Sequence, residues 1–293
     1  MSINICVLGN GREAFCHSLA KKGSSDDFTL YNSSYQGKLL NIMEPTRYPE
    51  KLAALANSLF LSDFVVFIID EINAQVGEQI VLLDLLGKKG CFISECEFSP
   101  FTKNTSLANW QILSQEDAKK FILSEFAPQE RLESTIIFID HSFEVKGIGS
   151  VLLGLVHSGR VKVHDELIAF PQKKSLDVKS IQKNDVDVPE AFPSDRVGLA
   201  IKKLKSEEIE RGNVLAKGEL QIVSELSEQM VYSRFAQRDS TAMTAFHCLQ
   251  SMPCKLEGGK LIFEKPLALV KGQPVIFCDL NKKMRIVGKL DIQ

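Results

Sequence analysis

The sequence predicts an α/β domain with a parallel sheet and flanking helices, followed by two small β-barrels. In its first part, short apolar runs alternate with helical spacing, which is typical of βα units that build a parallel sheet. The rest of the chain has no long helical period and consists of short apolar runs broken by glycine, as small barrels do. We therefore predict domains at residues 1–133, 134–216 and 217–293.

The first domain divides into recognisable elements. Apolar runs of strand length, helical spacing and a capping box at Ser114 and Asp117 mark them. In chain order we expect a strand at 3–8, a helix at 11–22, a helix at 52–60 with Pro49 in its first turn, a strand at 63–69, a helix at 76–86 ending at Gly87, a strand at 90–94 and a helix after 117.

The two barrels are expected to consist of strands that turn at glycines. Gly147, Gly149, Gly154 and Gly159 interrupt runs of Val, Leu and Ile, where glycine permits bulges and tight bends. A polar linker is expected at 128–133 and a second boundary near 216–219. In the last domain we expect strands at 260–263, 267–270, 275–279 and 284–287.

Composition is that of an ordinary globular protein, with 44% hydrophobic and 25% charged residues in 293. No apolar run has the length of a membrane span, and residues 1–8 begin a strand rather than a secretory leader, so a cytoplasmic location is expected. The cysteines are expected to be reduced and mostly buried, and they lack zinc-type spacing: Cys6, Cys16, Cys91, Cys96, Cys248, Cys254 and Cys278. We assign no metal site.

Charge is distributed unevenly along the chain. Residues 1–133 carry 12 Lys/Arg against 17 Asp/Glu, a balance of −5, whereas residues 217–293 carry 11 against 8, a balance of +3. Nucleic-acid contacts are therefore expected in the later part of the chain. Candidate basic clusters are Lys202-Lys203, Arg234 with Arg238, and Lys282-Lys283 with Arg285, although for any single cluster a solvated face is the favoured interpretation.

The region from Thr135 to Leu215 resembles the second domain of the translational GTPases, the barrel of elongation factor Tu and of the selenocysteine-specific factor SelB. The resemblance is carried by ordered motifs, DHSFEVKGIGSV at 140–151, GLV at 154–156, SGRVKV at 158–163, SDRVGL at 194–199 and IERGNVL at 209–215. Residues 284–288 are more weakly similar to the closing strand of the third SelB domain. The resemblance implies the elongation factor Tu architecture, with a P-loop-like first domain, and a barrel that holds the aminoacyl end of a charged tRNA.

The phosphate loop that this resemblance implies is damaged. The family motif is Gly-x4-Gly-Lys-Ser/Thr, whose backbone N–H groups wrap a phosphate while its hydroxyl binds magnesium. Here the first strand is followed by Gly9, Asn10, Gly11, Arg12 and Glu13, so the spacer has one residue instead of four. Glu13 replaces the hydroxyl, and two like charges about 4 Å apart repel by roughly 4 kcal/mol near a protein surface.

The two other nucleotide motifs of the family are altered as well. Where the family has Asp-x-Pro-Gly-His, this chain has Met43, Glu44, Pro45, Thr46 and Arg47, which lack the magnesium carboxylate and the histidine. Where the family reads guanine with Asn/Thr-Lys-x-Asp, the chain has Ser94, Glu95, Cys96 and Glu97. We therefore expect no GTP hydrolysis, no catalytic residue and no cofactor. GTP and magnesium are expected only under the alternative that an altered nucleotide site still works.

In SelB-like factors an acidic, a basic and an arginine residue surround the charged amino acid, and by position these match Asp140, His141 and Arg196. Arg196 would bind an anion or carbonyl, and His141 would donate a hydrogen bond. Each could instead serve a strand end or a turn. Asp140, His141 and Ser142 are not expected to form a hydrolase triad, because adjacent strand residues point to opposite faces. Arg160, Lys162, Arg234 and Arg238 are the expected RNA contacts.

The leading hypothesis is a SelB-like elongation factor relative that binds tRNA or the ribosome, not DNA or a membrane, as a monomer in the cytoplasm. The chain also resembles a paralogue found in methanogenic archaea that is labelled EF-Pyl. Because the sequence ends at Gln293, the additional SelB domain that binds an mRNA element is expected to be missing. Two alternatives are a working GTP-binding elongation factor that delivers a special aminoacyl-tRNA, and a protein-interaction module without ligand.

Overall fold

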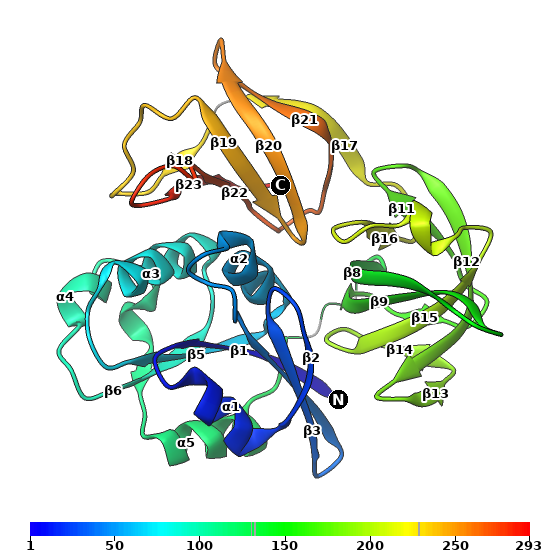
Figure 1. The fold of residues 1–293 in the computed structure, drawn as a ribbon, viewed down its shortest axis with the longest axis horizontal. Helices are drawn as coiled ribbons and strands as arrows, with labels where there is room; N and C mark the ends of the chain where they lie inside the picture. Colours follow the sequence, from blue (N-terminus) through cyan, green and yellow to red (C-terminus); the bar gives the residue numbers. More distant parts are fainter. Residues whose placement is uncertain (130, 132, 228) are drawn as a thin grey trace. The chain divides into compact units, whose positions relative to one another are not determined.

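The computed structural model describes residues 1–129, 131, 133–227 and 229–293 (Figure 1). The chain forms two compact units. The first comprises residues 1–128, 230–240 and 276–290, and the second comprises residues 129–229, 241–275 and 291–293. The linker predicted at 128–133 includes residues 130 and 132, which lie outside the described residues.

The first unit begins with a mixed sheet covered by helices on both faces. In the described part of the chain its strands lie in the order β2-β3-β4-β1-β5-β6-β7. The strand bounds are β1 Ser2–Gly9, β2 Lys21–Ser25, β3 Thr29–Tyr35, β4 Lys38–Glu44, β5 Phe64–Ile69, β6 Gly90–Ser94 and β7 Gln111–Ile112. The helices are α1 Arg12–Leu19, α2 Leu52–Leu61, α3 Ala74–Leu86, α4 Ser99–Thr102, η1 Ser106–Asn109 and α5 Gln115–Lys120, which continues as the π-helical turn η2 Phe121–Glu125.

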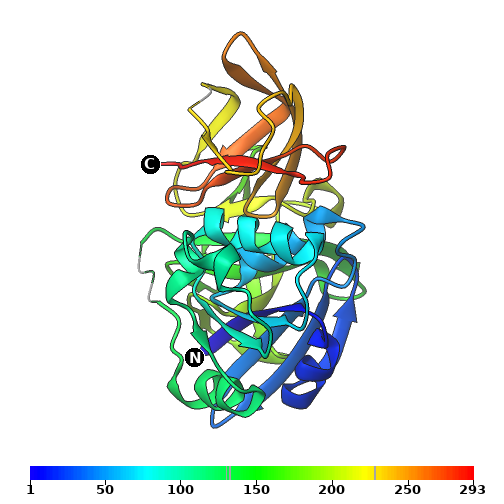
Figure 2. The same cartoon turned by 90° about the vertical axis from the view of Figure 1, so that its left-hand side faces the viewer.

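Alternation along β1 explains this layering. Ile3, Ile5 and Val7 face the side of the sheet where Phe15 of α1 and Ala118 of α5 complete one core. Helices α2 and α3 cover the opposite face, as Figure 1 shows, and Figure 2 presents the same layers from the side. The carboxyl ends of the parallel strands β4, β1, β5 and β6 therefore meet at one edge, where the loops carrying the predicted nucleotide motifs begin.

Several predictions for this unit are confirmed. Strands occur where residues 3–8, 63–69 and 90–94 predicted them, and α3 ends at Gly87, whose φ of 60° is the left-handed cap expected of glycine. Ser114 caps α5 by accepting from the Asp117 N–H at 3.1 Å.

Other predictions for this unit were wrong. The helix predicted at 11–22 ends at Leu19, because Ala20 is extended and the next residues enter β2. Pro49 lies before α2 rather than in its first turn, since the N-terminal cap of that helix is Lys51. The antiparallel strands β2 and β3 were not predicted, so the sheet is mixed rather than wholly parallel.

The second unit contains a closed barrel. Among the described residues its strands lie in the order β11-β16-β8-β9-β15-β12-β13, and β11 also pairs with β12, which closes the sheet. Its interior is lined by alternating Val, Ile and Leu side chains. The elements are β8 Ile136–Val145, β9 Gly149–Ser158, β10 Val161–Lys162, β11 Glu166–Phe170, β12 Lys174–Lys183, β13 Val186–Val188, β14 Glu190–Ala191, β15 Arg196–Lys202, η3 Ser206–Glu208 and β16 Val214–Ala216.

Strands β17 to β23 are divided between the two units. In the second unit, β21 pairs with β17 and with β20, and β20 pairs with β19; in the first unit, β18 pairs with β23. Their bounds are β17 Gln221–Ser227, β18 Val231–Tyr232, β19 Ala242–His247, β20 Gln250–Glu257, β21 Lys260–Leu269, β22 Val275–Cys278 and β23 Ile286–Leu290. The strands predicted at 260–263 and 267–270 are one strand, β21, and the strand predicted at 284–287 begins two residues later.

Candidate functional site

The loop after β1 is short and is fixed by its own neighbours. Gly9 has a φ of 87°, and a Cβ at this position would lie 1.7 Å from the Ile68 carbonyl oxygen of β5. Only glycine fits there without displacing backbone. The Asn10 N–H donates to the same carbonyl at 3.3 Å, and Gly11, with a φ of 67°, precedes the first residue of α1. One of the few N–H groups of this loop is thus already used within the sheet.

Arg12 is committed to protein groups. Its Nε lies 3.2 Å from Oε1 of Glu44, the last residue of β4, and its Nη1 donates to the Gly9 carbonyl at 3.2 Å. The second Glu44 oxygen accepts from the buried Tyr31 hydroxyl at 2.7 Å. Burial and this hydrogen bond raise the pKa of Tyr31, so its hydroxyl remains a donor. Arg12, Glu44 and Tyr31 thus join the carboxyl ends of β1 and β4 at the edge where a nucleotide would bind.

Glu13 lies on the exposed side of α1. Its carboxylate is 3.5 Å from Nζ of Lys22 and 3.8 Å from Nε2 of His17, and its side chain is 62% exposed. The carboxylate that replaces the magnesium hydroxyl in the sequence therefore pairs with basic neighbours on α1 and β2. The buried acid at this edge is Glu44, which sequence analysis quoted in the second motif but did not single out.

Two residues of the second altered motif, Thr46 and Arg47, contact the start of β3 and the turn before it. Met43 is buried within β4, and Pro45 follows the strand. The Thr46 hydroxyl lies 2.6 Å from that of Thr29, and the Arg47 N–H donates to the Asp27 carbonyl at 3.0 Å.

The third altered motif is used to hold strand ends. Ser94 ends β6, and its hydroxyl donates to the Ile69 carbonyl of β5 at 2.7 Å. Glu95 is exposed, whereas Glu97 accepts from the Ser99 N–H at 2.9 Å at the start of α4. Hydrogen bonds from Ser99 lower the pKa of Glu97, which places an ionised carboxylate at the start of α4.

In the barrel, the three residues predicted to surround an amino acid do meet. The Asp140 carboxylate has no exposed surface; one oxygen contacts Nη1 of Arg196 and the other lies 2.9 Å from Nδ1 of His141. Burial alone would raise the pKa of Asp140, but Arg196 and the hydrogen bond from His141 outweigh it and hold the pKa below its usual value. The site therefore contains an ionised, fully paired carboxylate at the base of two partly exposed side chains.

A β-bulge brings Asp140 and His141 to the same side of the strand. The pairing of β8 with β9 shifts register between Ile139 and His141, so Asp140 is the additional residue. The expectation that these two neighbours point to opposite faces was therefore wrong. The Ser142 hydroxyl donates to the Ile209 carbonyl at 2.5 Å, so the described contacts contain no Asp–His–Ser chain.

Sequence analysis missed Arg211, which completes this cluster. Its Nε donates to the Asp140 carbonyl oxygen at 3.0 Å, and its Nη2 lies 3.3 Å from Nε2 of His141. Arg211 belongs to the IERGNVL motif, and the glycine that follows it was the available hint: Gly212 has a φ of 94° and turns the loop before β16. Arg211 also lines a cavity of about 480 Å³ together with Asn213, Gln250 and Met252.

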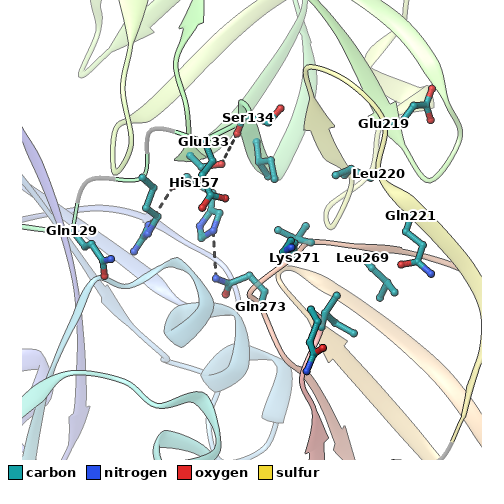
Figure 3. A pocket seen from close by; sticks show the side chains of 16 residues that line it. Gln129, Glu133, Ser134, His157, Glu219, Leu220, Gln221, Leu269, Lys271 and Gln273 are labelled. Atoms are coloured by element: carbon teal, nitrogen blue, oxygen red, sulfur yellow. Dashed lines mark hydrogen bonds between the residues drawn. The ribbon is translucent and has the colours of Figure 1, made fainter.

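A further cavity of the second unit, of about 500 Å³, lies between the starts of β8 and β17 and the turn after β21. Figure 3 shows His157 facing Gln273, with their side-chain nitrogens 3.4 Å apart. Arg131 donates to the His157 carbonyl at 3.3 Å. Basic and acidic residues are balanced in its lining, with Arg131 and Lys271 against Glu133 and Glu219, so its charge favours no class of ligand.

The predicted RNA contacts are exposed basic residues with partners of their own. In the second unit, Arg160 and Lys162 lie 3.9 Å and 3.7 Å from Glu190. In the first unit, Arg234 donates to the Asn104 carbonyl, and the Arg238 guanidinium lies 4.9 Å from the centre of the Tyr232 ring.

Arg285, expected in a phosphate-binding cluster, is instead a structural residue of the first unit. Its Nε lies 2.9 Å from Oε1 of Glu78 in α3, and its Nη2 contacts the other carboxylate oxygen. Its Nη1 donates to the Pro49 carbonyl at 2.8 Å. The Tyr48 hydroxyl donates to Glu78 at 3.0 Å, so the buried carboxylate is saturated.

The cysteines are free thiols, and all but Cys96 are buried. Burial raises the pKa of Cys91 and of Cys254 to about 12, which keeps both protonated at neutral pH. Within the described ranges, no group of His, Cys, Asp and Glu side chains has the arrangement of a metal site. No described helix combines the length and apolarity needed to cross a bilayer.

Comparison with known proteins places the chain near translation factors. Residues 149–216 match the model of elongation factor Tu domain 2. The protein MJ0325 of Methanocaldococcus jannaschii, whose function is uncharacterised, is 34% identical over 96% of this chain and 95% of its own length. The selenocysteine-specific elongation factor of the same organism is 43% identical over 77 residues, which are 26% of this chain and 16% of that protein.

A solved structure of similar fold covers almost the whole chain. Translation elongation factor SelB of Methanococcus maripaludis, in complex with the GTP analogue GPPNHP, superposes with a TM-score of 0.83 at 19% identity, over 98% of this chain and 78% of that one. The predicted fold class, an α/β domain followed by two small barrels as in elongation factor Tu, is thereby confirmed. The resemblance to the EF-Pyl branch stays a prediction.

Proposed function

Because the chain belongs to the translational GTPase family, in the branch that it shares with MJ0325, we propose that it is a SelB-like translation factor that binds aminoacyl-tRNA and does not hydrolyse GTP. The observation that carries the proposal is the cluster of Asp140, His141, Arg196 and Arg211 in the barrel. The proposal retains the predicted domain boundaries at 133/134 and 216/217, with tRNA bound through the second and third domains.

The cluster is suited to the end of a charged tRNA. Arg196 and Arg211 carry two positive charges and Asp140 one negative charge, so the cluster has a net charge of +1 before His141 is counted. A guanidinium held by a buried carboxylate is preorganised, because its orientation is fixed before a ligand arrives. Arg160 and Lys162 would add contacts to the phosphates of the acceptor end, and Arg234 and Arg238 would do so from the third domain.

The proposal that GTP is not hydrolysed rests on Arg12 and Glu44. To bind a phosphate, Arg12 would have to leave Glu44, and a buried carboxylate that loses a charged partner costs about 1–3 kcal/mol or more. The loop also has too few residues to supply the N–H groups of a phosphate cradle. Release of a bound tRNA would then follow competition or a partner rather than hydrolysis. In the cell we place the protein in the cytoplasm as a monomer, acting with tRNA or the ribosome.

The first test measures binding of aminoacylated and deacylated tRNA as a function of salt concentration. We expect affinity that falls as salt rises, because phosphate contacts release counterions. Arg196→Ala should reduce the preference for aminoacylated tRNA, whereas Arg234→Ala should weaken both forms equally and reduce the salt slope by about 1. Lys255→Ala, which removes an exposed charge of β20 outside the candidate site, is the control. If no tRNA binds at low salt, the proposal is wrong and an interaction module is favoured.

The second test measures thermal unfolding with millimolar GTP or GDP and magnesium. A ligand at 100 times its Kd stabilises a protein by about 2.7 kcal/mol, so a working site would be easily detected. We expect no change in the unfolding temperature. A nucleotide-dependent stabilisation that requires magnesium would instead favour a functional GTP-binding elongation factor.

A further inference from the structure

We infer that Arg211 is a positioning residue that holds His141 as its Nδ1–H tautomer, so that Arg196 rather than His141 donates to the ligand. The inference deepens the proposed function, because it describes the same pocket and rests on that function for its binding consequences. Its structural part concerns the protein alone.

The tautomer follows from the donors and acceptors around the ring. Nδ1 of His141 lies 2.9 Å from a carboxylate oxygen of Asp140, which only accepts when ionised, so Nδ1 carries the hydrogen. Nε2 lies 3.3 Å from Nη2 of Arg211, and a guanidinium only donates, so Nε2 presents its lone pair. An imidazole with a hydrogen on Nε2 would place two donors opposite each other.

Arg211 is itself held in place. Its Nε donates to the Asp140 carbonyl oxygen at 3.0 Å, so the guanidinium is anchored at one nitrogen and directs another at the imidazole. The bulge at Asp140 brings its backbone carbonyl and the His141 ring within reach of Arg211, while the Asp140 carboxylate contacts Arg196. Asp140 thereby acts on His141 in two ways: its carboxylate contacts Nδ1 of the ring, and its backbone carbonyl anchors Arg211, which contacts Nε2.

This arrangement changes which residue would meet the ligand. With Nδ1–H given to Asp140 and Nε2 accepting from Arg211, His141 has no donor left for a ligand. Arg196 uses Nη1 for Asp140, and its Nε and Nη2 form no hydrogen bond or ion pair with the described residues, while its side chain is 17% exposed. The pocket would therefore select a ligand group that accepts hydrogen bonds, such as a carbonyl, a carboxylate or another anion, over one that donates them.

The test is nitrogen NMR of the full chain labelled at histidine and studied without RNA at pH 8. His141→Asn assigns the resonances of this ring among the five histidines. We expect the wild type to show Nδ1 protonated and Nε2 unprotonated, with the Nε2 resonance shifted by an accepted hydrogen bond. Arg211→Met should remove that shift, and Arg211→Lys, which still donates, should retain part of it. A hydrogen on Nε2 of the wild-type ring would overturn the inference.

Two further readouts keep the test decisive. If Arg211→Met fails to fold, as judged by circular dichroism, the wild-type and Arg211→Lys spectra still establish the tautomer. In tRNA binding, Arg211→Met should reduce the preference for the aminoacylated form, and an unchanged preference would overturn the positioning role. Should the tautomer be as expected while no tRNA binds at all, the proposed function fails and the structural inference stands.

Discussion

Arg12 at the start of α1 lies 3.2 Å from Glu44 at the end of β4, so a charge pair within the protein joins the two strand ends where the family binds a phosphate. The side chain of Glu44 is 7% exposed and that of Arg12 is 26% exposed, so solvent screens the pair only in part. The same carboxylate accepts from Tyr31, which adds β3 to the network. This network makes the loop after β1 a structural element of the first unit.

Replacing Arg12 with Met should therefore destabilise the first unit. The buried Glu44 carboxylate would keep only Tyr31 as a partner, and we expect a loss of about 1–3 kcal/mol in the free energy of unfolding. The measurement is urea unfolding followed by the fluorescence of Trp110, which lies in this unit and is the single tryptophan of the chain. Lys22→Met, which breaks an exposed pair with Glu13, should cost less than about 1 kcal/mol. Equal losses in the two variants would contradict the role of Glu44.

Two glycines of the same loop should respond differently to alanine. Gly11→Ala meets open space, so its cost is that of a left-handed residue, about 1–2 kcal/mol. Gly9→Ala carries the same conformational cost and in addition collides with the Ile68 carbonyl, so we expect a loss larger by about 1–3 kcal/mol. Urea unfolding of both variants is the comparison. An Ala at position 9 as well tolerated as at position 11 would show that β1 and β5 separate more easily than described.

The sequence predicted the strands of this sheet better than its edge. Residues 64–69 are a continuous apolar run. Helices of βα units cover both faces of a parallel sheet, so a run of this kind indicates a central strand from the local sequence alone. Residues 21–25, by contrast, are all exposed in β2, so no alternation distinguished them from the end of a helix. Their conformation depends on pairing with β3, which is tertiary information that local spacing does not contain.

Removing Glu78 should strongly destabilise the first unit. Glu78→Ala leaves the Arg285 guanidinium, whose side chain is 16% exposed, without its carboxylate, and loss of one partner of a buried pair costs about 3–5 kcal/mol. The double variant Glu78→Leu with Arg285→Met should recover much of that loss, because no unpaired charge remains. Trp110 fluorescence in urea again reports the change. Glu71→Ala, at an exposed site before α3, is the control and should be nearly neutral.

His247 should make stability depend on pH between about 6.5 and 4. The ring is fully buried, accepts from the Val270 N–H at 2.8 Å through Nε2, and lies 3.0 Å from the Pro274 carbonyl through Nδ1. Burial lowers the pKa of His247 from 6.5 to about 4. Between these pH values the unfolded chain binds a proton that the folded chain does not. The contribution of the neutral His247 ring to the free energy of unfolding is therefore fully present above pH 6.5 and is lost as the pH falls toward 4. The total loss is on the order of 3 kcal/mol.

The difference in unfolding free energy between wild type and His247→Gln isolates this contribution, because the two proteins share every other titratable group. We expect the wild-type advantage, measured by urea unfolding at a series of pH values, to shrink as the pH falls from 6.5 to 4. A difference that stays constant over this range would show that the ring binds its proton equally well in the folded state.

The candidate site was predictable in its composition but not in its geometry. Asp140, His141 and Arg196 were identified from ordered motifs, and the structure brings them together. The side on which Asp140 and His141 lie was predicted wrongly, because strict alternation holds only while both strands advance one residue at a time. Arg211 was missed because it lies on a loop 70 residues after His141. The path of that loop is set by the barrel as a whole.

The additional residue at Asp140 also constrains any redesign of β8. Shortening β8 by one position beside Asp140 would remove this register shift and turn the carboxylate away from the imidazole, although every side chain of the cluster would still be encoded. If the four side chains were copied onto a strand without this bulge, they would all be present but would not contact one another. The length of the strand is as much a part of this pocket as the residues that line it.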